Sequence, residues 1–467
     1  MRLLLRIAPL LPLGLLASCA IYAPNERTDL HAHISPRFSL YSEQEMDTTN
    51  RWWKTFQSVE LNNLIDEALT NSPSIQQSWA RLAQAQAIAI KAGADRSLSV
   101  GYAGQAGATW VNQGGNSPIE DYELGLSASY EIDLWGRLKS VTEAAALDFE
   151  ASREELNTAA ITLSSQVALS WTAILAQRLQ ISVIQLQLKA NQTSLELIEL
   201  RFRKSQSTAM DVFQQRQTVA GTESLIPHAE LTAQLKKNEL TALLGRGDFQ
   251  SLEIIQRELP TLPPLPAIGI PADVLANRPD VRQAGLNLSA ADWQVSAARA
   301  DRLPALSLTG SLSSSAVDIH DLFDNWAANL AASLTGPIFE GGRRKAEVAH
   351  QRAIAHERLA IYRETVIEAI KEVEDALISE QKQHEYIKKL DARLTAARRS
   401  HQESINRYRS GVIEYTTVLI QLNTLQNLER DRIVAQYTLL QYRINLYRAL
   451  GGSWTDELPP ASFNNED

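Results

Sequence analysis

The sequence predicts a mainly helical protein that also contains β-strands, built from one structural unit that occurs twice. Three observations support this fold class. Matching motifs recur at one constant spacing, long stretches lack both glycine and proline, and four segments alternate between apolar and polar side chains. Alternation with a period of two is typical of a strand with two different faces, whereas stretches without glycine or proline favour long helices.

The chain begins with a segment that is typical of an export signal. Two arginines precede an apolar run at 10–16, which is too short to span a bilayer because a spanning helix needs about 20 residues. Residues 16–19 read Leu-Ala-Ser-Cys, which resembles the lipobox of bacterial lipoproteins, where the signal is cut before a cysteine that carries lipid. Cys19 is the only cysteine in the chain. By the same resemblance, Ala20 directs the mature protein to the outer membrane.

Matched motifs that lie 206 residues apart indicate an internal repeat. One offset fits motifs from one end of the unit to the other, so two copies of a single unit are the simplest explanation. The matched pairs are Pro73 and Pro279, Asp95-Arg96 and Asp301-Arg302, Gly136-Arg137 and Gly342-Arg343, Arg201-Phe202-Arg203 and Arg407-Tyr408-Arg409, and Leu244-Gly245 and Leu450-Gly451. The predicted organisation is a signal peptide at 1–18, a tether at 19–60, repeat one at 61–245, a proline-rich linker at 246–270, repeat two at 271–452 and a tail at 453–467.

Each repeat is expected to contain a helix, two strands and then long helices. Within 122–132 the even-numbered residues are apolar and the odd-numbered ones are Glu, Gly or Ser. The same even-numbered pattern begins at Leu98 and recurs at 306–312 and 328–334. Strands of about 9–11 residues are long enough to cross a membrane when they are tilted. The sequence therefore predicts two strands of membrane-spanning length in each copy.

The remaining parts of each copy are predicted to be long, antiparallel coiled-coil helices. Residues 137–220, 343–410 and 412–450 contain neither glycine nor proline. Apolar residues in these stretches are spaced alternately four and three apart, as in a coiled-coil seam. One example is Val366, Ile370, Val373 and Leu377. Several such seams in one helix require neighbours on more than one side, as in a bundle or an α-barrel.

Composition excludes several classes of protein. The net charge is −9, whereas nucleic-acid binding requires a basic surface. A mean hydropathy of −0.21 argues against a bundle of membrane helices, and a single cysteine argues against a disulfide framework or a cysteine zinc site. Glu347 and His350 have the spacing of half a di-iron motif, but the other ligands have no counterpart. We therefore predict no enzyme, no metal, no nucleic-acid partner and no cofactor other than lipid on Cys19.

Four strands cannot close a transmembrane barrel by themselves, because the smallest such barrels have about eight strands. An open strand edge cannot face lipid either, since its backbone groups would have no partners. Several chains must therefore contribute strands to one barrel, and three chains would supply 12 strands. Such a trimer would form a pore that continues into a helical tube.

Four motifs, doubled at the common offset, resemble those of the outer membrane factor family, the TolC-like and OprM-like channels of tripartite systems, and its lipoprotein branch in particular. The motifs are Ala276-Asn277-Arg278-Pro279-Asp280-Val281, Ala300-Asp301-Arg302-Leu303-Pro304, Gly336-Pro337-Ile338-Phe339-Glu340-Gly341-Gly342-Arg343 and Leu450-Gly451-Gly452. The resemblance implies a homotrimer with a shared 12-stranded barrel in the outer membrane and an α-helical barrel across the periplasm. It also implies a periplasmic membrane-fusion adaptor and an inner-membrane pump of the RND type as partners.

The resemblance further implies that functional residues gather at a helical hairpin turn in each repeat. The family pattern is an aromatic residue, a glycine three residues later and an aspartate six residues after that. Repeat one has Phe202, Ser205 and Asp211, and repeat two has Tyr408, Gly411 and Thr417. Each copy therefore departs from the pattern at one position, and the missing second aspartate implies a closed state held by fewer contacts.

The gate candidates that follow from this resemblance are Asp211, Tyr408, Arg407 and Glu414. A carboxylate repeated threefold around an axis would also attract cations to the entrance. The adaptor-docking candidates are Ser410, Gly411 and Val412, whereas Lys204-Ser205-Gln206 departs from the docking pattern.

The predicted function is the outer-membrane exit duct of a tripartite efflux pump that exports small molecules such as drugs or toxic compounds. The predicted location is the outer membrane, with a lipid anchor and an extension into the periplasm. Two alternatives remain at this point: a lipid-anchored periplasmic coiled-coil adaptor or scaffold, and the outer-membrane channel of a type I protein secretion system.

Overall fold

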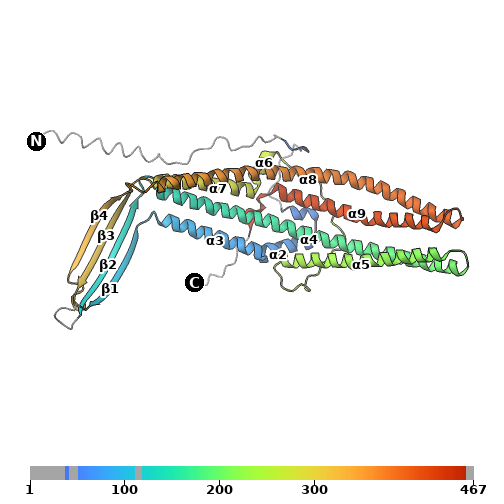
Figure 1. Ribbon diagram of the computed structural model, residues 1–467, viewed down its shortest axis with the longest axis horizontal. Helices are drawn as coiled ribbons and strands as arrows, with labels where there is room; N and C mark the ends of the chain where they lie inside the picture. Colours follow the sequence, from blue (N-terminus) through green and yellow to red (C-terminus); the bar gives the residue numbers. More distant parts are fainter. Residues whose placement is uncertain (1–36, 41–50, 111–117, 459–467) are drawn as a thin grey trace. The chain divides into compact units, whose positions relative to one another are not determined.

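The computed structural model describes residues 37–40, 51–110 and 118–458 (Figure 1). The predicted signal peptide and Cys19 lie outside the described residues. The chain divides into two compact units, here called the strand unit and the hairpin unit. The strand unit comprises Ala80–Glu154 and Arg282–Thr365; the hairpin unit comprises Glu155–Val281, the described chain from Val366 onwards and the described residues up to Trp79.

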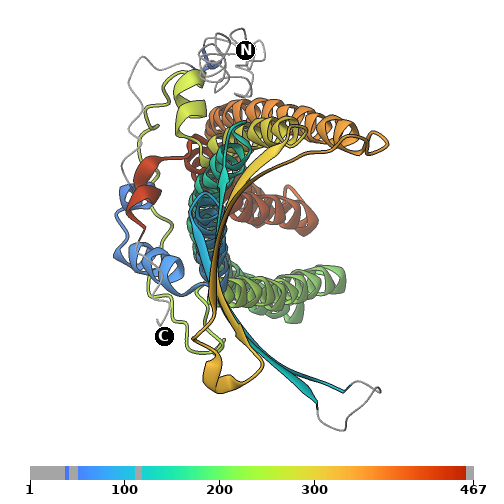
Figure 2. The same cartoon turned by 90° about the vertical axis from the view of Figure 1, so that its left-hand side faces the viewer.

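The described part of the strand unit contains one antiparallel sheet with the strand order β1-β2-β3-β4. Its strands are β1 (Ser99–Thr109), β2 (Ile119–Ile132), β3 (Ala305–Ala316) and β4 (Trp326–Thr335). Figure 2 shows that the four strands bend together as one curved sheet. Each repeat supplies two neighbouring strands, which confirms the predicted pair of strands in each copy.

The register of the sheet separates apolar from polar side chains. One row of paired residues is apolar: Val100, Ala128, Gly310 and Leu330. The next row is small and mostly polar: Gly101, Ser127, Ser311 and Asn329. Because successive residues of a strand point to opposite faces, the even-numbered residues form one apolar face, as predicted. The two outer strands, β1 and β4, pair on one side only within the described chain, so the sheet is open at both edges. The sheet is therefore both amphipathic and open.

The helices follow the same repeat. Repeat one contains α2 (Val59–Asn71), α3 (Pro73–Ala94), α4 (Arg137–Arg203) and α5 (Ala209–Leu243); repeat two contains α6 (Pro271–Asn277), α7 (Pro279–Ala300), α8 (Arg343–Arg409) and α9 (Tyr415–Leu450). The helices α3 and α7 begin and end 206 residues apart, and so do α4 and α8. Both α4 and α8 are 67 residues long. These matches confirm the internal repeat and the long helices.

In the hairpin unit, α4 turns back into α5 and α8 turns back into α9, and Figure 1 shows both turns at the right-hand end of the view. We call these pairs hairpin one and hairpin two. Among the described residues, only α4 contains a window apolar enough to cross a membrane, and 78% of that window is buried inside the protein. The apolar window is therefore explained as the core-facing part of α4.

Side chains at the end of the sheet tie the strands to the following helices. The indole N–H of Trp135 donates to the carbonyl of Pro304 at 2.7 Å. Gly336 approaches Pro304 so closely that an added Cβ would lie 2.9 Å from its ring. Arg137, the first residue of α4, binds both carboxylate oxygens of Glu131 at 2.9 and 2.7 Å. The packing against Pro304 explains the glycine at position 336, because this junction has no room for a larger side chain.

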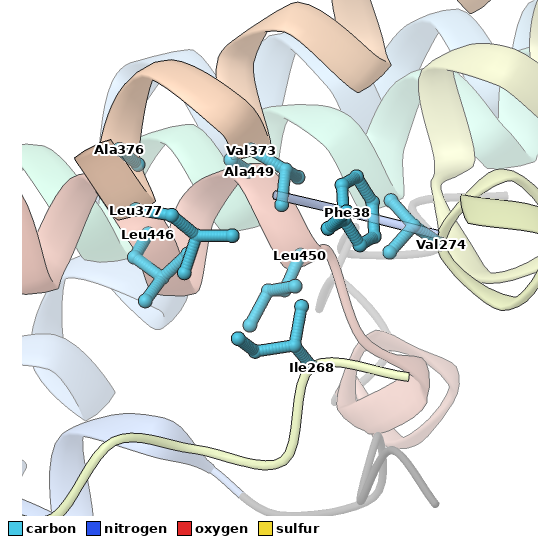
Figure 3. Packing of buried hydrophobic residues seen from close by; sticks show 9 residues of the cluster. All are labelled: Phe38, Ile268, Val274, Val373, Ala376, Leu377, Leu446, Ala449 and Leu450. Carbon is cyan, nitrogen blue, oxygen red and sulfur yellow. The ribbon is translucent and has the colours of Figure 1, made fainter. Parts of the chain in front are cut away.

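The core of the hairpin unit joins segments that are far apart in the sequence. Figure 3 shows one cluster of buried residues there: Phe38, Ile268, Val274, Val373, Ala376, Leu377, Leu446, Ala449 and Leu450. Phe38 precedes repeat one and Ile268 lies in the linker, whereas the last six residues lie on α8 and α9. The flanking segments of the chain are therefore packed against repeat two.

The proline-rich linker contains neither helix nor strand between residues 251 and 270, yet it is held in place. Arg443 of α9 is 2% exposed in its side chain and forms an ion pair with Glu380 of α8. Its guanidinium also donates to the carbonyls of Pro263 and Pro264, the latter at 2.8 Å. A buried charge needs this full set of partners, so Arg443 fixes the path of the linker.

The residues just before α2 also pack into the hairpin unit. Trp52, Trp53 and Phe56 are buried in a short 3₁₀-helix, η1 (Trp52–Phe56). Tyr447 of α9 stacks on Trp52 with 5.3 Å between the ring centres. These residues fall within the predicted tether at 19–60, because a five-residue helix is too short to show a periodic pattern.

Candidate functional site

The two hairpin turns have the same backbone hydrogen bonds at equivalent positions. In turn one, residues 204–208, Gln206 N donates to Arg201 O at 2.8 Å and Ser205 N donates to Phe202 O at 2.9 Å. In turn two, residues 410–414, Val412 N donates to Arg407 O at 2.9 Å and Gly411 N donates to Tyr408 O at 3.0 Å. This pair of bonds is the Schellman motif, which satisfies the last carbonyls of a helix. Both helices therefore end in the same way.

The motif requires one residue with a positive φ angle, and the two turns supply it differently. Gly411 has φ +74° and Ser205 has φ +57°. An L-residue in this left-handed region is disfavoured by roughly 1–2 kcal/mol because its Cβ crowds the next carbonyl oxygen. The serine that replaces the expected glycine thus keeps the shape of the turn at a conformational cost.

The helices that leave the two turns are also capped differently. Thr208 caps α5: its hydroxyl accepts from Asp211 N at 3.2 Å, and the Asp211 carboxylate accepts from Thr208 N at 2.9 Å. The same carboxylate accepts from the Ser207 hydroxyl at 2.7 Å. Glu414 occupies the equivalent capping position of α9, but its side chain makes no capping hydrogen bond. Asp211 therefore has a local role, and Thr417 does not reproduce it.

Tyr408 is placed between the two hairpins. The Arg201 guanidinium lies over the Tyr408 ring, 4.8 Å from its centre. The rings of Tyr408 and Tyr415 are 5.3 Å apart. Tyr408 packs against an apolar cluster from both hairpins: Ile198, Val212, Tyr415, Val418 and Leu419. Among the described contacts there is no hydrogen bond between Tyr408 and Asp211, so these two gate candidates are not directly paired within this chain.

The other two gate candidates lie on the surface. Arg407 forms an ion pair with Glu403 at 2.8 Å, and both side chains are more than half exposed. Exposed pairs of this kind contribute about 0–1 kcal/mol, so little holds Arg407 to its partner. Glu414 is exposed at the start of α9. Both charges are available to another molecule.

The docking candidates form the open side of turn two. Ser410 donates its hydroxyl to Asn406 O at 3.0 Å. A Cβ added to Gly411 would meet no heavy atom within 4 Å, and Val412 is 67% exposed. The structure thus brings Ser410, Gly411 and Val412 together as a small exposed surface.

Tyr415, the first residue of α9, was not among the site residues predicted from the sequence. It is 6% exposed, and its hydroxyl donates to Gln215 Oε1 of α5 at 2.8 Å. Burial raises the pKa of the Tyr415 phenol well above its usual value, and the nearby Tyr408 and Asp211 add to this shift. One signal for this contact was present: Gln215 lies in the buried row of α5 with Val212 and Val219, at helical spacing.

An open amphipathic sheet of four strands and two long helical hairpins define the class of TolC-like outer-membrane channels. Solved channels support this class. A structure of CusC matches with a TM-score of 0.84 and 26% identity, covering 93% of this chain and 100% of that chain. VceC from Vibrio cholerae matches with a TM-score of 0.81 and 28% identity, covering 87% of this chain and 100% of that one.

The sequence comparisons define the family. The model of the outer membrane efflux protein family matches residues 64–246 and 270–452, and the chain belongs to this family. The pyoverdine export outer membrane protein OpmQ of Pseudomonas aeruginosa is 32% identical over 456 residues, covering 95% of this chain and 96% of OpmQ. Outer membrane protein OprJ of the same species is 30% identical over 418 residues and 86% of each chain. The predicted family, fold class and outer-membrane location are confirmed, and the chain is an outer-membrane efflux channel.

Proposed function

We propose that three copies of the chain close a 12-stranded barrel in the outer membrane, and that their hairpins form the periplasmic entrance to this efflux channel. The observation that carries the proposal is the open amphipathic sheet, whose outer strands β1 and β4 each have one unpaired edge in the described chain. In lipid such an edge leaves backbone groups without partners. Pairing β4 of one chain with β1 of the next removes every edge, and the apolar face can then meet lipid while the polar face lines water.

In this arrangement the tips of the hairpins control the entrance. Asp211, Tyr408, Arg407 and Glu414 are the gate residues, since they lie at or beside the two turns and the charges of Arg407 and Glu414 are exposed to a neighbouring chain. A periplasmic membrane-fusion adaptor docks at Ser410, Gly411 and Val412, which are exposed together. An inner-membrane pump of the RND type drives export, because a duct of this kind has no energy source of its own.

The proposed cargo is small molecules such as drugs or toxic compounds. OpmQ is named for pyoverdine export, and an Escherichia coli relative, 28% identical over 411 residues and covering 87% of this chain and 89% of its own, is named the cation efflux system protein CusC. The polar face of the sheet carries mainly small side chains such as Ser127, Ser311 and Asn329. Small polar residues offer few contacts that would select one solute.

The proposed membrane anchor is lipid on Cys19, after removal of 1–18. SilC of Salmonella typhimurium, which is 26% identical over 468 residues and covers 97% of this chain and 99% of its own, is named a probable outer membrane lipoprotein. Two repeats at 61–245 and 271–452, joined by the linker at 246–270, complete the proposed organisation. A Cys19→Ser variant should incorporate no labelled palmitate, and a labelled variant would refute the anchor.

Cross-linking between strand edges tests the assembly. Thiols are introduced on β1 (Gly101→Cys) and, one at a time, at three positions of β4 (Asn329→Cys, Ala331→Cys and Ser333→Cys), all on the polar face. Oxidation should give covalent trimers and no larger species for at least one pair. The control pair places both thiols on β2 and β3, Ser127→Cys and Ser311→Cys, which pair within one chain and should give monomers only. Monomers from every β1–β4 pair would contradict the shared barrel.

Conductance separates the channel from its alternatives. The purified protein in planar bilayers should conduct ions, and loosening the tip with Asp211→Ala should increase that conductance. A periplasmic adaptor or scaffold would conduct under no condition. A type I secretion channel would also conduct, but cells lacking this chain would then fail to secrete a protein rather than become sensitive to small toxic compounds.

A further inference from the structure

A row of buried polar side chains joins hairpin one to hairpin two. Its members come from α4, α5 and α9, and none is more than 5% exposed. We call this row the amide ladder; it consists of Gln187, Asn191, Gln215, Thr222 and Gln426. Neither the helical repeat nor the apolar core explains it, because apolar side chains would fill the same space without desolvating amides.

Asn191 and Gln426 form the centre of the amide ladder. Gln426 Nε2 donates to Asn191 Oδ1 at 2.9 Å, and Asn191 Nδ2 donates to Gln426 Oε1 at 3.3 Å. Asn191 Nδ2 also donates to Thr222 Oγ1 at 2.9 Å. Since Asn191 lies on α4, Thr222 on α5 and Gln426 on α9, this pair fastens both helices of hairpin one to hairpin two.

Towards the turns, the amide ladder reaches the tyrosine pair. Gln215 Nε2 donates to the carbonyl of Asn191 at 2.7 Å, and Gln215 Oε1 accepts from the Tyr415 hydroxyl at 2.8 Å. The Tyr415 ring in turn lies against Tyr408. The position of Tyr408 at the tip therefore depends on a chain of contacts that begins at Asn191.

Away from the turns, the amide ladder ends at charged groups of α9. Gln187 Nε2 donates to the carbonyl of Gln426 and to Glu429 Oε2, both at 3.1 Å. Gln187 Oε1 accepts from Arg430 Nη1 at 2.5 Å. This end again joins α4 of repeat one to α9 of repeat two.

Buried hydrogen bonds of this kind resist partial separation. Each amide that loses its partner keeps the full desolvation penalty, because water does not reach it. Satisfied polar networks therefore favour one arrangement of helices over all intermediate ones. Hairpin two can move away from hairpin one only if the whole amide ladder opens and water enters.

We propose that the amide ladder is a latch between the two hairpins, and that Asn191, Gln215 and Gln426 are positioning residues for the gate. They act through Tyr415 and Tyr408 and set the fraction of channels whose periplasmic entrance is closed. This inference rests on the proposed function, in which the hairpin tips form the entrance.

The test compares Gln426→Met with wild type in planar bilayers. Methionine keeps the length of the side chain but leaves the Asn191 amide without its partner. The open fraction should rise about tenfold, in line with the desolvation penalty of one orphaned amide. Cells should also admit vancomycin, an antibiotic too large for an intact outer membrane. The exchanged pair Asn191→Gln with Gln426→Asn restores complementary amides and should return the open fraction towards the wild-type value.

Gln383→Met is the matched control. Gln383 Nε2 of α8 donates to Ala435 O of α9 at 2.8 Å, so this amide bond lies within hairpin two. Its loss should lower the melting temperature by less than Gln426→Met, because Gln383 is only half-buried, and should leave the open fraction unchanged. Where Gln426→Met does not yield folded protein, Thr222→Val removes one bond to Asn191 with little change of shape and should give a smaller rise in open fraction.

The latch and the channel can fail separately. Equal open fractions for Gln426→Met, Thr222→Val, Gln383→Met and wild type, with a higher value for Asp211→Ala, would overturn the latch and leave the channel intact. Absence of conductance in every one of these proteins would contradict the proposed channel itself.

Discussion

Turn one and turn two share one backbone and differ in the residues that stabilise it. Turn one places Ser205 in the left-handed region but has a complete cap from Thr208 and Asp211. Turn two places Gly411 there but has no capping side chain on α9. Each turn thus combines one favourable and one unfavourable feature, and both keep the same Schellman hydrogen bonds.

The difference assigns unlike roles to the two tips. The Asp211 Oδ2 atom accepts from both Ser207 and Thr208 within turn one, so half of this carboxylate is engaged locally. Turn two is instead anchored from the side, because Tyr415 has its hydroxyl bound to Gln215 of the other hairpin. Its repeat-one counterpart, Ala209, has no such group. Turn one is therefore stabilised locally, whereas turn two depends on contact between hairpins.

The largest effect on this comparison is expected from Tyr415→Phe. Removing the hydroxyl leaves the buried Gln215 Oε1 without its donor, which should cost about 2 kcal/mol of local stability. Amide hydrogen exchange at residues 415–419 should accelerate, while exchange at residues 209–213 should change less. Tyr408→Phe is the control, since no described hydrogen bond uses the Tyr408 hydroxyl, and it should leave exchange almost unchanged. Equal acceleration in both turns would contradict the proposed sideways anchor.

Asp211→Ala should produce the reverse pattern. Loss of the capping carboxylate should destabilise the start of α5 by about 1 kcal/mol and raise hydrogen exchange at residues 209–213. The matched variant Thr417→Ala removes the equivalent side chain of α9, which takes no part in a capping box. It should leave exchange in turn two within experimental error, and a comparable loss there would show that Thr417 has an unrecognised capping role.

Exchanging the left-handed residues changes backbone strain alone. Ser205→Gly should stabilise turn one by about 0.5 kcal/mol, because glycine tolerates a positive φ but loses more freedom on folding. Gly411→Ser should destabilise turn two by a similar amount, since the space around Gly411 is open and no clash adds to the strain. Hydrogen exchange at residues 204–206 and 410–412 measures both changes. If Ser205→Gly and Gly411→Ser both stabilised or both destabilised their turns, residues 205 and 411 would not share one backbone conformation in solution.

The fold was largely predictable because each of its signals is periodic. The alternation of apolar and polar residues in 122–132 matches the two faces of the sheet that the strand register defines. The 206-residue offset between Arg201 and Arg407 also separates the ends of α4 and α8. The contacts of the turns were less predictable. That Ser205 would keep a glycine conformation, and that Tyr415 would reach Gln215 on another helix, depend on packing between hairpins, which residue spacing does not encode.

The smallest expected effect is a pH dependence that differs between the two hairpins. His401 of α8 occupies the place of Leu195 in repeat one, and burial lowers its pKa, while Glu429 acts in the opposite direction. Its Nδ1 has no hydrogen-bond partner in the described structure. A lowered pKa in the folded state means that the unfolded state binds the proton more readily, so stability falls as pH drops below about 6.5, the ordinary histidine value. Hydrogen exchange in hairpin two should therefore rise modestly between pH 7 and 5, with little change in hairpin one. The His401→Leu variant copies repeat one and should remove this dependence; a pH response that persists in the variant would place its origin elsewhere.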